Sequence, residues 1–144
     1  MRLSIDANDT IVTWIRELDR QPGWMRPRRR IPIERLRCHP DLCDRLESIA
    51  EGLPARLRYV AGLPVLIHPN SVIFAIAGGT SWAALRLPEH AHSAVARSTW
   101  GRRGLEDDWV DVDPWLTEVP AREGLSRLKG WCHAACEHAR ALRK

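Results

Sequence analysis

The sequence predicts an α+β fold in which N-terminal and C-terminal helices pack on one face of an antiparallel β-sheet meander. Two helical segments come first, followed by a run of short strands, a short helix, a further strand and a long closing helix. Turn sequences separate the strands of the run, as is typical of strands that pair antiparallel with their neighbours. With 144 residues, 44% of them hydrophobic, the chain is long enough to build one domain around its own core.

The first part of the chain is expected to form a helix followed by an extended arm. Asn8 or Asp9 can cap the helix, and apolar residues then recur at helical spacing before the helix ends ahead of Pro22. From there prolines and arginines follow without any periodicity, which indicates an extended connector. We therefore expect a single domain with three parts: an N-terminal helix at 1–21, an arginine- and proline-rich arm at 22–37 and an α+β core at 38–144.

The core begins with a helix and continues into the sheet. Pro40 suits the first turn of this helix, and Gly52 can take the left-handed conformation that ends it. Short runs rich in aliphatic and β-branched residues then predict strands at 56–61, 65–68, 72–77 and 81–87. Because Gly78 and Gly79 permit a tight hairpin between the two most apolar runs, we expect the hairpin at 72–87 in the centre of the sheet. A short helix at 89–97, a strand at 109–112 and a closing helix at 122–142 complete the fold.

The charge is distributed unevenly, although the net charge is only +4. Residues 26–37 contain six arginines and one glutamate, which favours contact with an anionic partner. Residues 105–123 contain seven acids and one arginine, which we interpret as a solvated acidic edge. The chain is therefore expected to be electrically bipolar.

Alternation along the strands predicts a second binding surface. If Leu85 and Val110 face the helices, then Trp82, Arg86 and Trp109 lie together on the other face, which we expect to be exposed. Arg56 and Arg58 share one face of the first strand in the same way. Tryptophan and arginine dominate protein-interface hot spots and also stack on unpaired bases. The predicted binding residues are therefore those of the arm and of this face: Arg26, Arg28, Arg29, Arg30, Trp82, Arg86 and Trp109.

The layout of residues 41–139 resembles the MmcQ/YjbR-like family of small bacterial α+β proteins. The resemblance rests on an opening helix, a closing helix and four short motifs: Gly62-Leu63-Pro64, Phe74-Ala75, Ala84-Leu85-Arg86-Leu87 and Trp109-Val110-Asp111-Val112. Arg86 stands where the family tends to have lysine, Pro114-Trp115 follows the last strand, and the arginine-rich arm has no counterpart there. Members of that family have often been labelled DNA-binding, without a catalytic site, so the resemblance implies a binding module.

The cysteines and histidines form two groups that contain possible zinc ligands. The first group is Cys38, His39 and Cys43, and the second is Cys132, His133, Cys136 and His138. A four-ligand site is conceivable if the two helices meet, but the spacings are not those of a zinc finger, ribbon or knuckle. Because Cys132 lies on the apolar stripe of the closing helix, we expect ordinary packing cysteines and a chain that folds without metal.

No catalytic constellation is recognisable in the sequence. The histidines at 68, 90 and 92 lie near turns or on a polar helix, and no serine or cysteine occupies a nucleophile elbow. The acidic segment lacks the glycine and closing glutamate of a calcium loop, and Gly78-Gly79-Thr80 lacks the lysine of a phosphate-binding loop. We therefore predict no enzyme, no metal and no cofactor.

Two functions fit these observations. The first is a non-enzymatic bacterial protein-interaction module, such as an adaptor or an immunity protein that masks a partner through its acidic edge or its Trp and Arg face. The expected partner is another protein, either a toxin or an acidic protein. The alternative is a nucleic-acid-binding protein that grips phosphates with the arm. The sequence has no apolar run long enough to span a membrane and no signal-peptide pattern, and its four cysteines suit a reducing compartment, so a cytoplasmic location is expected.

Overall fold

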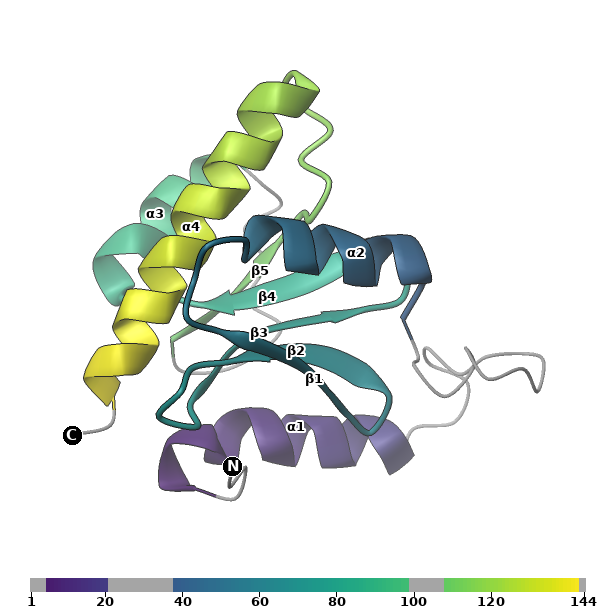
Figure 1. The fold of residues 1–144 in the computed structure, drawn as a ribbon, viewed down its shortest axis with the longest axis vertical. Helices are drawn as coiled ribbons and strands as arrows, with labels where there is room; N and C mark the ends of the chain where they lie inside the picture. Colours follow the sequence, from purple (N-terminus) through teal and green to yellow (C-terminus); the bar gives the residue numbers. More distant parts are fainter. Residues whose placement is uncertain (1–4, 21–37, 99–107, 143–144) are drawn as a thin grey trace.

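The computed structural model describes residues 5–20, 38–98 and 108–142. The elements follow one another in the order that the sequence predicts, which confirms the α+β class (Figure 1). They are a 3-10 turn η1 (Asp6–Asn8), α1 (Asp9–Arg20), α2 (Pro40–Ile49), β1 (Arg56–Val60), β2 (Leu63–Ile67), β3 (Ile73–Gly78), β4 (Trp82–Arg86), α3 (Glu89–Ser98), β5 (Trp109–Val112) and α4 (Ala121–Leu142). The arm at 22–37 lies outside the described residues.

Helix α2 begins and ends at the positions that the sequence predicts. Pro40 occupies the first turn, where a missing N–H costs nothing, and Nδ1 of His39 accepts a hydrogen bond of 3.1 Å from the backbone N–H of Asp41. After Ile49 the chain turns away through Gly52, whose φ is +85°. A residue with a Cβ atom would be strained at that φ, so the glycine stops the helix.

The five strands form one antiparallel meander in the order β1-β2-β3-β4-β5. The hairpin of β3 and β4 lies inside the sheet, which confirms its predicted central place. Strand β2 begins at Leu63, two residues earlier than expected, because the turn before it consists only of Ala61 and Gly62, with φ of +51° and +83°. Two central residues with positive φ are typical of the type I′ turn that closes tight hairpins.

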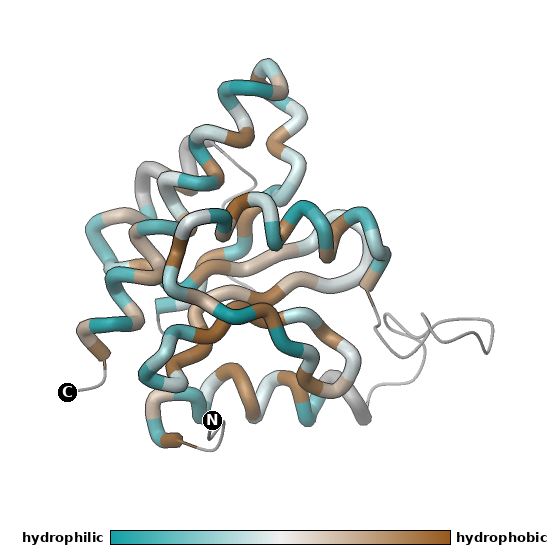
Figure 2. Tube along the Cα trace, viewed as in Figure 1, coloured by the Kyte–Doolittle hydropathy of each residue, from teal (hydrophilic) through white to brown (hydrophobic). Residues whose placement is uncertain are grey.

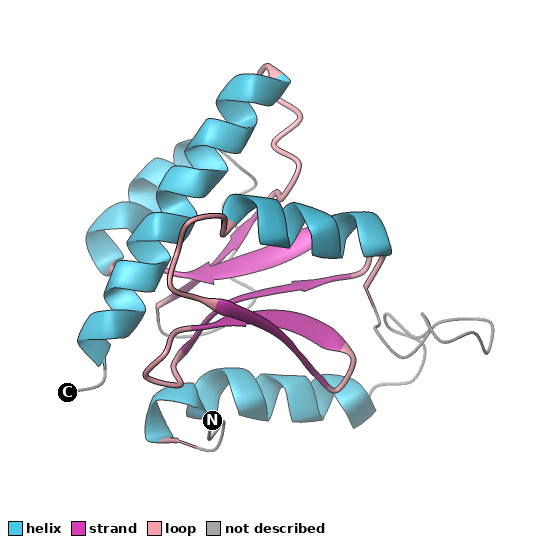
Figure 3. Cartoon of the chain, viewed as in Figure 1, coloured by secondary structure: helices cyan, strands magenta, loops and turns pink. Residues whose placement is uncertain are grey.

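The helices cover both faces of the sheet, so the expectation that they all pack on one face is wrong for α1. Figure 1 shows α2 and α4 on one side of the sheet and α1 on the other. Every residue of β2 and β3 is buried, and such strands need a cover on each face. On the α1 side, Ile11 and Ile15 pack against Val65 and Ile76. Figure 2 shows hydrophobic stretches concentrated along the strands, and Figure 3 shows the strands enclosed between the helices.

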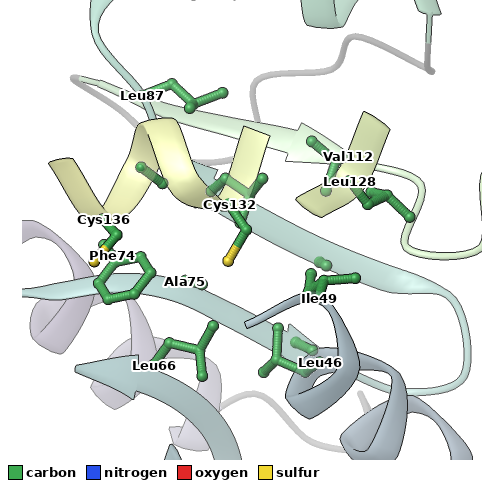
Figure 4. Close-up of a cluster of buried hydrophobic side chains, with 14 of the residues drawn as sticks. Leu46, Ile49, Leu66, Phe74, Ala75, Leu87, Val112, Leu128, Cys132 and Cys136 are labelled. Carbon is green, nitrogen blue, oxygen red and sulfur yellow. The ribbon is translucent and has the colours of Figure 1, made fainter. Parts of the chain in front are cut away.

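The larger core lies between the sheet and the helices α2 and α4. Leu46 and Ile49 of α2 and Leu128 and Cys132 of α4 point toward the sheet in this core (Figure 4). The register between β2 and β3 shifts after Leu66, which pairs with Ala75 while Ile67 pairs with Ile73, so Phe74 is the extra residue of a β-bulge. Phe74 and Ala75 consequently both contribute to this core.

In the part of the chain that the structure describes, no helix combines the length and the apolarity needed to cross a bilayer.

Candidate interaction surface

The predicted face of Trp82, Arg86 and Trp109 exists, but α1 and η1 cover it. All three side chains lie on the α1 side of β4 and β5, as alternation predicts. Trp109 has no exposed surface, Arg86 is 8% exposed, and Trp82 is half-buried with its ring stacked on Trp14 at a centroid distance of 4.9 Å. The expectation that this face is exposed is therefore wrong, because the first helix packs on it. The other predicted binding residues, Arg26, Arg28, Arg29 and Arg30, lie outside the described residues.

Arg86 joins the N-terminal segment to the sheet. Its Nε donates to both carboxylate oxygens of Asp108 at 2.9 Å, and a terminal guanidinium nitrogen donates to the backbone carbonyl of Ala7 in η1. The guanidinium also lies 5.9 Å from the centre of the Trp109 ring, within the range of a cation–π contact. These contacts satisfy the charge of a nearly buried arginine within the chain, which makes it part of the fold rather than a ligand group.

Asp108 extends this network to helix α4. Nε2 of His138 lies 2.6 Å from a carboxylate oxygen of Asp108, and the backbone carbonyl of Asp108 accepts from the N–H of Leu87 at 2.8 Å. A histidine–aspartate pair also occurs in nucleophilic enzymes, where the imidazole contacts a hydroxyl or thiol. Within the described residues, the imidazole of His138 is hydrogen-bonded to Asp108 alone, so no nucleophile is in place. The network ties η1, β4, β5 and α4 together.

The predicted solvated acidic edge is wrong for Asp108, Asp111 and Asp113, whose side chains are largely buried, whereas Glu118 and Glu123 are exposed. Asp111 and Asp113 are 4% and 5% exposed, because β5 is covered on both faces. Asp113 accepts from the backbone N–H of Trp115 at 3.0 Å. The Nε of Arg45 donates to the carbonyl of Pro114 at 2.9 Å, and its guanidinium lies 5.5 Å from the Trp115 ring centre. These contacts fasten α2 to the segment after β5. Glu106 and Asp107 lie outside the described residues.

All four cysteines are unpaired and buried in the core beneath α2 and α4. Burial raises the pKa of Cys132 to about 12, and the neighbouring Cys136 thiol adds to the shift. Burial, followed by the adjacent Cys43 thiol, likewise raises the pKa of Cys38. Cys132 is a packing residue of the closing helix, as expected. Across the described ranges, no group of three or more His, Cys, Asp or Glu side chains is arranged to hold a metal ion.

Strand β1 is the outermost strand on its side of the sheet and exposes three of its five side chains. Arg56 and Arg58 are exposed, as is Tyr59, at 45% of its surface. Desolvation raises the pKa of Tyr59 to about 12, with the Cys43 thiol and the Glu47 carboxylate adding to the effect, so the phenol faces the side of the sheet that α2 covers. We call these three side chains, with the outward backbone groups of the strand, the β1 edge.

Two further features surround the β1 edge. Helix α2 exposes a row of acids, namely Asp41, Asp44, Glu47 and, just past the helix end, Glu51, and of these Glu47 lies near Tyr59. An open hollow lies at the start of the strand, lined by Leu53, Pro54, Ala55, Arg56 and Pro69. Sequence reasoning placed Arg56 and Arg58 correctly on one face but missed Tyr59. The signal was a strand with arginines on one face, which distinguishes an edge strand from the all-apolar strand beside it.

Comparison with known proteins gives no identification, since the chain matches no family model, no curated protein and no solved structure. The resemblance to the MmcQ/YjbR-like family stays a prediction.

Proposed function

We propose that this chain is a non-enzymatic protein-interaction module of the adaptor or immunity type, and that the β1 edge is its contact surface. The observation that carries the proposal is the exposure of Tyr59, at 45%, in an edge strand flanked by the exposed guanidinium groups of Arg56 and Arg58. Tyrosine and arginine are enriched among the residues that dominate binding energy at protein interfaces. The pair of residues that most resembles catalytic machinery, Asp108 and His138, is occupied in joining β4, β5 and α4.

The charge around the β1 edge favours a protein over a nucleic acid as the partner. The Glu47 carboxylate that α2 places near Tyr59 would repel a phosphate backbone, whereas a protein can match acidic and basic groups with its own. The nucleic-acid alternative depends on Arg26, Arg28, Arg29 and Arg30, outside the described residues.

The four free thiols support a reducing compartment, so we propose that the interaction takes place in the cytoplasm. A toxin is one kind of partner that such a module masks there.

The proposal is tested by photo-crosslinking in the cells that produce the protein. A photoreactive amino acid in place of Tyr59 is expected to give a defined protein adduct, and the same amino acid in place of His133, which is exposed on α4, is expected to give none. Lysates are treated with nuclease before electrophoresis. Adducts at both positions alike, or an adduct at position 59 that nuclease removes, would contradict the proposed function; the second result would favour nucleic-acid binding.

A further inference from the structure

The backbone of β1 has hydrogen-bonding groups at the open side of the sheet that no strand of the described residues uses. The two-residue turn of Ala61 and Gly62 makes Val60 and Leu63 a hydrogen-bonded pair, and such pairs alternate along an antiparallel ladder. Arg58 with Val65 and Arg56 with Ile67 are then the next bonded pairs. The N–H and C=O groups of the residues between them, Leu57 and Tyr59, therefore point away from β2. No strand in the described residues pairs with that edge.

From this geometry we propose that the β1 edge binds an extended, acidic segment of a partner protein as a sixth, antiparallel strand. The inference rests on the proposed function and names the chemistry of its partner. Strand addition of this kind uses main-chain hydrogen bonds for affinity and alternate side chains for specificity. Here the main-chain groups are those of Leu57 and Tyr59.

The side chains of β1 set the pattern of the incoming strand. Arg56 and Arg58 lie on the same face as Val60, which packs on the α1 side, and both guanidinium groups are exposed. Carboxylates directly opposite them would be close enough to attract them across the strands. On the other face, the Glu47 carboxylate is near Tyr59, so a carboxylate opposite Tyr59 would be repelled. The incoming strand therefore has acids on one face and uncharged, β-branched residues on the other.

A second copy of the chain fits the β1 edge less well than an acidic segment does. Suppose that all five residues of β1 pair antiparallel with β1 of a second copy. Arg58, the middle residue, then lies directly opposite Arg58 of the second copy. Like charges at directly opposed positions destabilise a strand pair, and charged edge strands are a common protection against self-association. The same arginines that oppose a homodimer select an acidic partner.

Synthetic peptides test the proposal with the full chain unaltered. The probe has the core Thr-Val-Glu-Val-Glu, which places glutamates opposite Arg58 and Arg56 and valines opposite Tyr59 and Leu57. At millimolar concentration it is expected to bind and to slow solvent exchange of the Leu57 and Tyr59 amide protons, as measured by NMR. The matched peptide with lysines for glutamates is expected to bind at least about tenfold more weakly, because two attractive pairs become repulsive.

Methylation of the peptide backbone distinguishes strand addition from simple charge attraction. N-methyl groups on the two valines remove the N–H groups that face Leu57 and Tyr59, so binding is expected to be lost. N-methyl groups on the two glutamates lie on the outer side of the added strand, so binding is expected to persist. Equal effects of the two methylation patterns, or no binding of the unmethylated acidic peptide, would overturn the inference.

A charge-reversed protein completes the experiment. The double variant Arg56→Glu and Arg58→Glu changes two exposed side chains, so it is expected to fold and to prefer the lysine peptide over the glutamate peptide. A variant that folds but keeps the preference for glutamate would overturn the proposed pairing. If position 59 crosslinks to a protein while the peptides fail to bind, the interaction function stands and strand addition fails. If the acidic peptide binds but no protein is crosslinked, the proposed cellular function fails instead.

Discussion

At the scale of single residues, Asp108 is an acid that connects strand β4 to helix α4. It accepts from Arg86 through both carboxylate oxygens and contacts Nε2 of His138. The three side chains are between 10% and 19% exposed, so water replaces these contacts poorly. Removing one partner of a nearly buried ion pair leaves the other charge without compensation, which costs more than a surface pair contributes.

Asp108→Asn is therefore expected to lower the free energy of unfolding by about 2–3 kcal/mol. The control is Glu123→Gln, which breaks the pair of Glu123 with Arg127, a contact of 2.6 Å between side chains that are 49% and 37% exposed. That loss is expected to be below about 1 kcal/mol because solvent screens the pair. Urea denaturation of both variants measures the difference. Equal losses would show that the Asp108 network contributes no more than a surface ion pair.

At the scale of elements, local patterns predicted every α-helix and strand of the described residues, but they predicted neither the 3-10 turn η1 nor the face on which α1 packs. The apolar stripe with Ile11 and Ile15 predicts that one side of the helix is buried. The same stripe would suit either face of the sheet, so it does not indicate which face the helix covers. The unbroken apolar sequence of β2 and β3 was the available signal, since a sheet that is buried on both faces needs two covers. Because α1 was expected on the opposite face, the face of Trp82, Arg86 and Trp109 was wrongly predicted to be exposed.

The buried side chain of Asn8 holds the start of α1 in place. No periodicity in the sequence indicates this role. Asn8 has no exposed surface; its amide donates to the carbonyl of Ser71 and its side-chain oxygen accepts from the N–H of Ile73, each at 2.8 Å. Sequence reasoning assigned Asn8 as a possible helix cap, whereas the structure uses it to attach η1 to the beginning of β3. A long-range contact of this kind leaves no trace in local spacing.

Asn8→Ala is expected to lower the free energy of unfolding by about 2–3 kcal/mol, since it leaves a buried donor and a buried acceptor without their partner. Because the loss is local, hydrogen exchange should increase first in α1 and near Ile73, ahead of the β3–β4 hairpin. Asp9→Ala is the matched control, since its side chain is exposed one position away. A uniform increase in exchange across the sheet would contradict a role confined to docking the first helix.

At the scale of the whole molecule, the sheet divides the interior into two cores of different chemistry. The core on the α1 side contains aliphatic residues and tryptophan, whereas all four thiols lie in the core under α2 and α4. A thiol in such surroundings resists ionisation, because the thiolate would lose its hydration. Burial raises the pKa of Cys38, Cys132 and Cys136, so the protonated state of these three thiols is part of the stability of the fold.

Cys132 provides a test of this coupling between pH and stability. Its pKa rises from 9.0 to about 12 on burial, so the folded state favours the protonated thiol; the resulting stabilisation is complete below about pH 9 and is lost as the pH rises toward 12. Between about pH 8 and pH 11 the thiol of Cys132 is expected to account for a loss on the order of 2 kcal/mol in the free energy of unfolding. Cys132→Ala removes the ionisable group, so its stability should fall less steeply over this range, although the variant starts lower because of the small cavity it leaves. Urea midpoints across the pH series measure both slopes, and parallel curves for the two proteins would show that ionisation of this thiol is not coupled to unfolding.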